Sequence, residues 1–248
     1  MSNTDGPMQA AQRLMRPTLS KRFYEKAEAA EIEGGWGVML DGRPVRTPAK
    51  TILSVPRREL AEELAQEWQA QVEVIDPNRM PLTRLVNSAL DGVSRESDAV
   101  RAEIVKYAGS DLICYRAEGP DRLVAQQTAA WNPVLDWAHD HLGVRFVVAE
   151  GVMFVSQPPE ALDAVAREVE NLDVLRLSAL STSMTLTGST LISLALLRGR
   201  LSLQESWAAA HVDEDWNIEL WGADDEAMER RAARFEEMQA AARLMALA

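Results

Sequence analysis

The sequence predicts an α+β fold, with a small N-terminal antiparallel β domain followed by a larger, mainly α-helical domain. Two observations lead to this prediction. Turn-forming pairs separate short apolar runs between residues 20 and 55, which is typical of antiparallel strands. After Pro56, apolar residues recur at the spacing of one face of an amphipathic helix.

The β domain is expected over residues 20–56. Two glycine-containing turn pairs divide it, Gly34-Gly35 and Asp41-Gly42. The second pair joins residues 36–40 to residues 45–48 in a predicted hairpin, because Asp-Gly favours a tight two-residue turn. Residues 51–55 predict a further strand, and Pro56 closes the region.

The helical domain is expected over residues 57–248. Leu60, Leu64 and Trp68 mark one apolar face of its first helix. The later segments are, in order, a long helical pattern over 85–105, a helix over 122–142, one or two short strands over 144–155, and a helix that begins at 158–159.

Three signals define the C-terminal part of the helical domain. Residues 191–197 are apolar on nearly every face, so this segment is predicted to be the buried central helix. Ser202 and Glu205 have the spacing of a capping box and predict the start of a helix. Acidic residues from Asp224 onward favour the N-terminus of the last helix.

Composition limits the class of partner. The chain has 248 residues, 47% hydrophobic and 26% charged, which is an ordinary globular composition. Its formal net charge of −12 argues against nucleic acid, because phosphate binding requires a basic face. The longest apolar stretch is far shorter than the roughly 20 residues of a membrane span. We therefore expect neither a nucleic-acid partner nor membrane insertion.

The first 19 residues are interpreted as a flexible N-terminal tail. They lack the apolar core of a secretory signal. Basic residues along the chain are almost all arginine, which indicates a GC-rich bacterial genome. The acidic balance fits a protein kept in solution in the cytoplasm.

The sequence offers few residues for catalysis or metal binding. Cys114 is the single cysteine and lies in an apolar string, which predicts a buried, inert thiol. His139 and His141 are two residues apart on a predicted helix, so they point to different sides of it. His211 has no second histidine or cysteine nearby, and phosphate-binding glycine motifs are absent. We expect no catalytic residue, no metal and no cofactor.

Tryptophans beside acidic residues stand out instead. Glu67-Trp68 ends the first helix, and a second acidic run precedes Trp216 and Trp221. These two tryptophans are five residues apart, so one of them is expected to leave the core. Trp207 is predicted to be a core residue. The nearby acids are either a solvated face or, with an aromatic anchor, a site for a protein partner.

Several strings carry a resemblance, and their order and spacing give it weight. They are Lys21-Arg22-Phe23-Tyr24, Leu40-Asp41-Gly42-Arg43-Pro44-Val45-Arg46-Thr47-Pro48, Glu67-Trp68-Gln69-Ala70-Gln71, Met80-Pro81-Leu82-Thr83-Arg84-Leu85, Asp111-Leu112-Ile113-Cys114-Tyr115-Arg116, Trp131-Asn132-Pro133, and Asp213-Glu214 through Glu219 to Trp221-Gly222. Over residues 21–229 the sequence resembles the ATP synthase alpha-subunit assembly chaperone family of alphaproteobacteria and mitochondria. Two positions depart from the family pattern: Asn132 replaces the usual Asp, and Trp216-Asn217 replaces an aromatic residue followed by Gln.

The resemblance implies a non-catalytic chaperone without a cofactor, whose partner is the unassembled alpha subunit of the F-type ATP synthase. It implies action in the bacterial cytoplasm, and in the mitochondrial matrix for eukaryotic relatives. The acids would pair with basic groups of the partner, and the tryptophans and the methionine would supply apolar contact. The predicted partner-binding residues are Glu67, Trp68, Met80, Asp213, Glu214, Glu219 and Trp221.

Other interpretations stay open from the residues alone. Trp68 shares a face with Leu60 and Leu64, so core packing is an alternative to partner contact. The acids at Asp213 and Glu214 are compatible with an enzyme of unrecognised type that has a carboxylate-lined interdomain cleft. A general interaction domain unrelated to ATP synthase is a third alternative.

Overall fold

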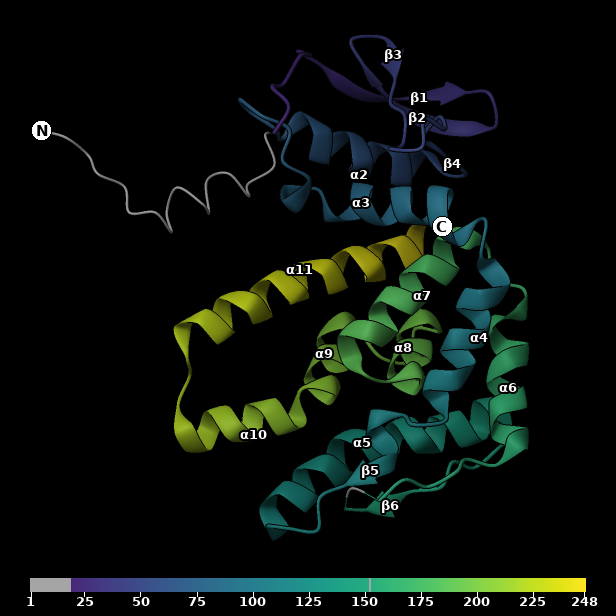
Figure 1. Cartoon of the computed structure of the whole chain (residues 1–248), viewed down its shortest axis with the longest axis vertical. Coiled ribbons are helices and arrows are strands. Elements are labelled where there is room, and N and C mark those ends of the chain that lie inside the picture. The colour runs from purple at the N-terminus through teal and green to yellow at the C-terminus, as the bar shows by residue number, and fades with distance from the viewer. Residues whose placement is uncertain (1–18, 152) are drawn as a thin grey trace, which may run out of the picture.

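The computed structural model describes residues 19–151 and 153–248, and it has an antiparallel sheet near the N-terminus followed by helices (Figure 1). The predicted α+β class is therefore confirmed. The predicted tail lies outside the described residues except for residue 19. The strands of the sheet are β1 (Ala27–Ile32), β2 (Gly35–Leu40), β3 (Arg43–Pro44) and β4 (Ser54–Val55).

The sheet is built from hairpins at the two predicted turn pairs. β2 lies between β1 and β3, with Ala29 opposite Val38, and also pairs with β4. Asp41 and Gly42 both have positive φ, the conformation that a tight two-residue hairpin turn requires. Gly35 is needed for space as well, because a Cβ there would lie 2.5 Å from a backbone oxygen of β4. A hairpin is present at the predicted Asp41-Gly42 turn, but its second strand is Arg43–Pro44, two residues earlier than the predicted residues 45–48.

Helix α2 (Arg58–Gln69) covers one face of the sheet. Its buried residues Leu60 and Leu64 pack in one cluster with Val38 and Leu53 of the sheet region. Burying each such side chain contributes about 1.5–3 kcal/mol relative to leaving it in water. Seen from the top of Figure 1, the sheet, α2, α3 (Pro81–Ser88) and α11 (Asp225–Leu247) follow one another as layers.

The remaining helices form the lower body in Figure 1. They are α4 (Ser97–Ala108), α5 (Asp121–Leu142), α6 (Pro159–Glu170), α7 (Val174–Thr187), α8 (Thr190–Leu197), α9 (Leu203–Ala210) and α10 (Val212–Trp221). A short parallel pair, β5 (Tyr115–Arg116) and β6 (Ala149–Glu150), lies beside α5. Single turns of 3-10 helix occur at Pro77–Arg79 and Leu112–Cys114.

One sequence expectation needs correction, and another is met by a single short strand. The long helical pattern over 85–105 is interrupted by a π turn at Ala89–Val93, where Gly92 disfavours regular helix. Of the one or two short strands expected over 144–155, one is present in the described residues, β6. Next to it, the side-chain amide of Gln157 accepts from the Val147 N–H at 2.8 Å and donates to its carbonyl at 2.9 Å. That amide pairs the Val147 backbone without a neighbouring strand.

Helix α8 is the buried centre of the lower body, as predicted. Leu191, Ile192 and Leu194 are fully enclosed, and α8 packs against α5, α7 and α9. The buried carboxylate of Asp111 accepts from the Leu191 N–H at 2.9 Å, at the N-terminus of α8. Burial raises the pKa of Asp111 to about 6. The predicted capping box at Ser202 is also present and begins α9.

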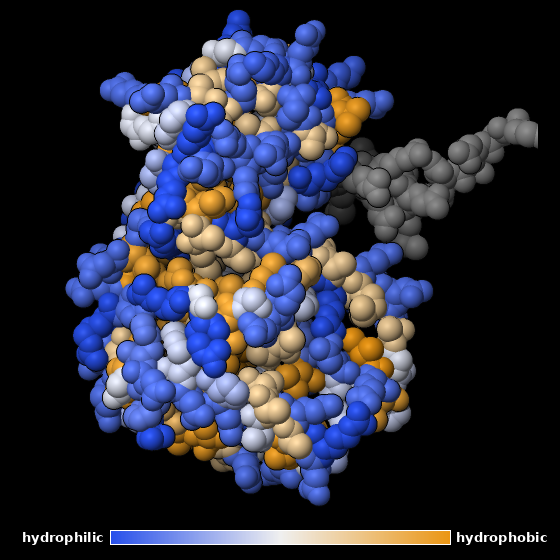
Figure 2. All heavy atoms as spheres, turned by 180° about the vertical axis from the view of Figure 1, so that it is seen from behind, coloured by the Kyte–Doolittle hydropathy of each residue, from blue (hydrophilic) through white to orange (hydrophobic). Residues whose placement is uncertain are grey.

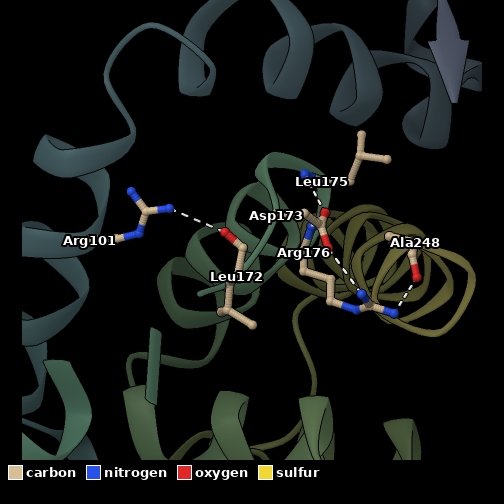
Figure 3. Close-up of polar contacts among 6 residues, drawn as sticks. All are labelled: Arg101, Leu172, Asp173, Leu175, Arg176 and Ala248. Carbon is tan, nitrogen blue, oxygen red and sulfur yellow. Dashed lines mark hydrogen bonds and ion pairs between the residues drawn. The ribbon is translucent and has the colours of Figure 1, made fainter. Parts of the chain in front are cut away.

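The N-terminus of α7 joins three parts of the chain (Figure 3). The carboxylate of Asp173 accepts from the backbone N–H groups of Leu175 and Arg176, each at 3.0 Å, and so caps the helix. Arg176 also donates to the carbonyl of Ala248 at the end of α11. Arg101 of α4 donates to the Leu172 carbonyl at 3.2 Å. These bonds hold α4 and α11 to the start of α7.

Candidate partner-binding site

The predicted acids of the tail lie on α10. Asp213, Glu214 and Asp215 form its first turn. Negative charges there are favourable because they face the positive end of the helix dipole. Glu219 lies two residues before the helix ends at Trp221. The structure thus brings four of the seven predicted partner-binding residues together on one helix.

Asp213 and Glu214 differ in how the chain holds them. Asp213 accepts from the Gln127 side chain of α5 at 2.7 Å, so it helps to fix α10 on α5. Glu214 lies 3.7 Å from the ring nitrogen Nε2 of His211. Burial lowers the pKa of His211, so the ring is uncharged at neutral pH. His211 therefore does not form an ion pair with the Glu214 carboxylate at neutral pH.

Further along α10, two acids bind arginines of neighbouring helices. Arg231 of α11 lies 2.5 Å from Asp215, and Arg122 of α5 pairs with Glu219. The guanidinium of Arg122 also lies over the Trp216 ring, 5.4 Å from its centre. Sequence reasoning missed Arg122, Gln127 and Arg231 as partners, because a separation of up to 97 residues leaves no periodic signal.

The two tail tryptophans take opposite environments, as their spacing predicts. Trp216 is 9% exposed and packs inward, whereas Trp221 is 84% exposed at the C-terminal end of α10. Its neighbour Leu220 is also exposed. Gly222 follows with positive φ and turns the chain toward α11. The result is an apolar tip at the C-terminal end of α10, at the other end of the helix from its acidic first turn.

Trp207 supports the corner between α9, α10 and α11. Its ring lies 3.8 Å from that of His211, centre to centre, and meets Phe235 of α11 edge-on at 5.1 Å. The side chain is half-buried. The prediction of a core position for Trp207 is thus met in part, since the ring packs at the rim of the interior.

A groove of about 580 Å³ lies between α5, α9 and α10. Its lining includes four alanines together with Pro133 and Trp216, and it also includes charged residues. The lining residues are Gln126, Ala129, Ala130, Pro133, Arg200, Leu201, Glu205, Ala208, Ala209, Val212, Asp215, Trp216 and Glu219. Of the predicted residues, Glu219 borders this groove.

Glu67 lies apart from α10, at the junction of α2 and α3. Its carboxylate accepts from the backbone N–H groups of Leu82 at 2.8 Å and Thr83 at 2.7 Å. These are otherwise unpaired donors in the first turn of α3, so Glu67 caps that helix from a distance. Burial raises the pKa of the Glu67 carboxyl.

The neighbouring predicted residues also face inward. Met80 is only 2% exposed, so in this conformation it contributes to packing and offers no surface to a partner. Trp68 is half-buried against the main core, and its backbone carbonyl accepts from the Tyr24 hydroxyl at 2.6 Å. The structure therefore divides the predicted residues into an inward group at α2 and α3 and a surface group on α10.

The cysteine and the histidines that could take part in catalysis or metal binding are packed against other side chains. Cys114 is buried, and burial raises the pKa of its thiol to about 12, so it stays protonated at neutral pH. His141 stacks on Trp137 and contacts Glu168 at 3.1 Å. Within residues 19–151 and 153–248, histidine, cysteine and carboxylate side chains form no cluster of three that could hold a metal ion. None of the helices in that part of the chain has the length and apolarity to cross a membrane.

Comparison with known proteins identifies relatives along most of the chain. The family model described as ATP12 chaperone protein matches residues 21–139. Protein atp12, mitochondrial, from Schizosaccharomyces pombe is 24% identical over 227 residues, which cover 86% of this chain and 78% of the relative.

Solved structures are closer in sequence. The Atu1473 protein of Agrobacterium tumefaciens is 48% identical, with a TM-score of 0.89 over 99% of this chain and 92% of that chain. Atp12 from Paracoccus denitrificans is 42% identical, with a TM-score of 0.86 over 92% of this chain and 98% of that one. An aspartate-to-lysine mutant of the Paracoccus protein matches equally well.

Proposed function

This chain belongs to the ATP12 chaperone family, and from that premise we propose that it binds the unassembled alpha subunit of the F-type ATP synthase. The family acts as chaperones in ATP synthase assembly. In the proposal, the protein covers the alpha subunit until the beta subunit replaces it. It works without catalysis or a cofactor, in the bacterial cytoplasm.

The chemistry of assembly explains what such a protein must do. A subunit destined for a large complex exposes an apolar face before its neighbour arrives, and exposed apolar faces aggregate. A chaperone must cover that face and then release it. Contact through a small apolar anchor with a charged rim suits this task, because rim charges speed association while the buried area stays limited.

The single observation that carries the proposal is the tip of α10. Trp221 is 84% exposed, and Leu220 beside it is exposed as well. Large aromatic side chains are among the most frequent energetic anchors of protein interfaces. Glu219 lies two residues before Trp221 on the same helix, and Asp213, Glu214 and Asp215 occupy the first turn at its other end. An acidic, aromatic surface of this kind fits a partner with apolar and basic groups.

Other parts of the surface also carry apolar side chains, and these differ from Trp221 in exposure. Figure 2 shows the face opposite to that of Figure 1, where hydrophilic side chains cover most of the sheet region and apolar ones gather lower down. Exposed apolar residues also occur elsewhere, including Phe23, Val72, Met153 and Phe154. In the part of the chain that the structure describes, Trp221 is the most exposed large apolar residue.

The test is capture of the alpha subunit. Immobilised wild-type protein should retain purified alpha subunit, suppress its aggregation in light scattering, and release it when the beta subunit is added. Trp221→Ala should leave the melting temperature nearly unchanged, within about 0.5 kcal/mol of stability, because the side chain is exposed. It should weaken capture by about tenfold or more, as expected for an anchor residue. Failure of the wild-type protein to retain the alpha subunit would refute the proposal.

A further inference from the structure

We propose that the groove between α5, α9 and α10 receives an apolar side chain and a neighbouring basic side chain of the alpha subunit. In the free chaperone, Arg122 occupies the place of that basic side chain. The inference rests on the function proposed above, from which the client is taken. It adds a specific binding site on the chaperone and describes the chemistry of the alpha-subunit segment that would bind there.

The groove has room for apolar side chains. Ala129 of α5 and Ala208 of α9 are exposed wall residues, and Pro133 and Trp216 contribute further apolar surface. An alanine side chain ends at Cβ, so the space between the helices stays open to larger groups. The volume of 580 Å³ lies within the range of about 300–1,000 Å³ found for ligand pockets. A large apolar side chain can enter without moving the walls.

The charges around the groove determine which kind of client segment it favours. The groove lining includes the acids Glu205, Asp215 and Glu219 and the base Arg200. Arg231 pairs with Asp215, and Arg122 pairs with Glu219, so Glu219 is freed for another base when Arg122 leaves. Asp213 and Glu214 add negative charge in the first turn of α10. An acidic segment would meet repulsion at this rim, whereas a basic one would be attracted. The occupant that the groove favours is therefore a segment with apolar side chains and at least one arginine or lysine.

Arg122 shows where the basic side chain would lie. Its guanidinium pairs with the Glu219 carboxylate and lies 5.4 Å from the centre of the Trp216 ring. An aromatic face together with a carboxylate is a suitable site for a guanidinium group. Both charged side chains are largely exposed, and exposed ion pairs stabilise a fold little. Arg122 can therefore leave this site without loss of the fold, and a basic side chain of the client can take its place.

The groove is tested by filling it. Ala129→Leu and, on the opposite wall, Ala208→Leu put an apolar side chain where the client side chain would lie. Affinity for purified alpha subunit should fall by about tenfold, because an occupied pocket cannot accept the anchor. Ala232→Leu, an exposed alanine on α11, is the matched control and should bind like the wild type. Unchanged binding of both groove variants would overturn the proposal.

The role of Arg122 gives an effect of opposite sign. Arg122→Gln removes the internal competitor and should strengthen binding by up to about fivefold, the equivalent of one exposed ion pair. Arg230→Gln makes the same change of charge at an exposed arginine of α11, which pairs with Glu226, and serves as the control. If Arg122→Gln binds the alpha subunit more weakly than the wild type, or no better than the control, Arg122 does not compete with the client's basic side chain for this site.

The two proposals fail in different ways. If the wild-type protein does not capture the alpha subunit at all, the proposed function and the groove both fall. If the wild type captures it and the groove variants capture it equally well, only the groove assignment is overturned. Melting temperatures of all variants accompany the binding measurements, so that a folding defect is recognised directly.

Discussion

The α2–α3 junction and helix α10 each carry a glutamate and a tryptophan predicted to bind a partner, yet these residues have opposite environments in the two places. At the junction, Glu67 bonds to two backbone N–H groups of α3, and Trp68 packs against the core. On α10, Glu214 faces an uncharged histidine and Trp221 extends into solvent. The difference comes from the surroundings: the first turn of α3 supplies unpaired donors to Glu67, whereas α10 ends at the surface.

The residue type alone therefore does not distinguish a side chain that caps a helix from one that contacts a partner. A glutamate beside a helix N-terminus satisfies backbone donors, and its loss damages the fold. A glutamate on an exposed helix turn contributes little to the fold and remains free to meet a partner. The predictions below separate these two cases by measuring stability and binding on the same variants.

The largest expected effect on stability is at Met80. Met80→Ala removes a buried side chain and should lower the free energy of unfolding by about 3 kcal/mol, because a cavity is left behind. Trp221→Ala removes a larger side chain from the surface and should cost less than about 0.5 kcal/mol. Urea unfolding measures both. An equal loss of stability in the two variants would contradict the assignment of Met80 to the core and Trp221 to the surface.

A smaller effect is expected at Glu67. Glu67→Ala leaves the N–H groups of Leu82 and Thr83 without their acceptor and should cost about 2 kcal/mol. Glu62→Ala, in the exposed pair with Arg58 on the same helix, should cost no more than about 0.5 kcal/mol. Chemical denaturation compares the two. A loss at Glu62 as large as that at Glu67 would contradict the capping role.

The smallest effect is a pH dependence from Glu67. Its pKa is raised in the folded protein by burial, so the folded state binds the proton more strongly than the unfolded chain does. This contribution to stability is present below the unfolded pKa, about 4.3, and is lost as pH rises through the raised value. The stability advantage of the wild type over Glu67→Gln should shrink across that window. An advantage that grows with pH there would show that the pKa is lowered instead.

Local signals predicted much of the fold. The Asp41-Gly42 turn, the Ser202 capping box and the apolar run of α8 each act over a few neighbouring residues, and all three formed as expected. The interruption at Ala89–Val93 was missed, because the apolar spacing continues through it while the backbone changes to a π turn.

The candidate site was harder to predict, because its contacts join distant segments. The four tail residues were found together, since they are close in sequence. Arg122 and Glu219 are 97 positions apart, so no periodicity connects them. The capping role of Glu67 depends on how α2 meets α3, which the sequence alone does not specify. Runs of alanine on α5 and α9 were the one sequence signal for the groove, and they are equally typical of helix packing.

Charge reversal at Glu214 tests whether the surface of α10 binds the alpha subunit. Glu214→Lys should keep a near-normal melting temperature, because the side chain is partly exposed and its neighbour His211 is uncharged at neutral pH. Glu229→Lys makes the same reversal at an exposed residue of α11 and is the control.

The measurement is the affinity of these folded variants for purified alpha subunit. The account predicts that Glu214→Lys loses at least about 2 kcal/mol of binding, because like charges then meet at the interface, while the control retains wild-type affinity. Equal affinity of both variants and the wild type would show that the acidic turn of α10 is solvated surface and would contradict the claim.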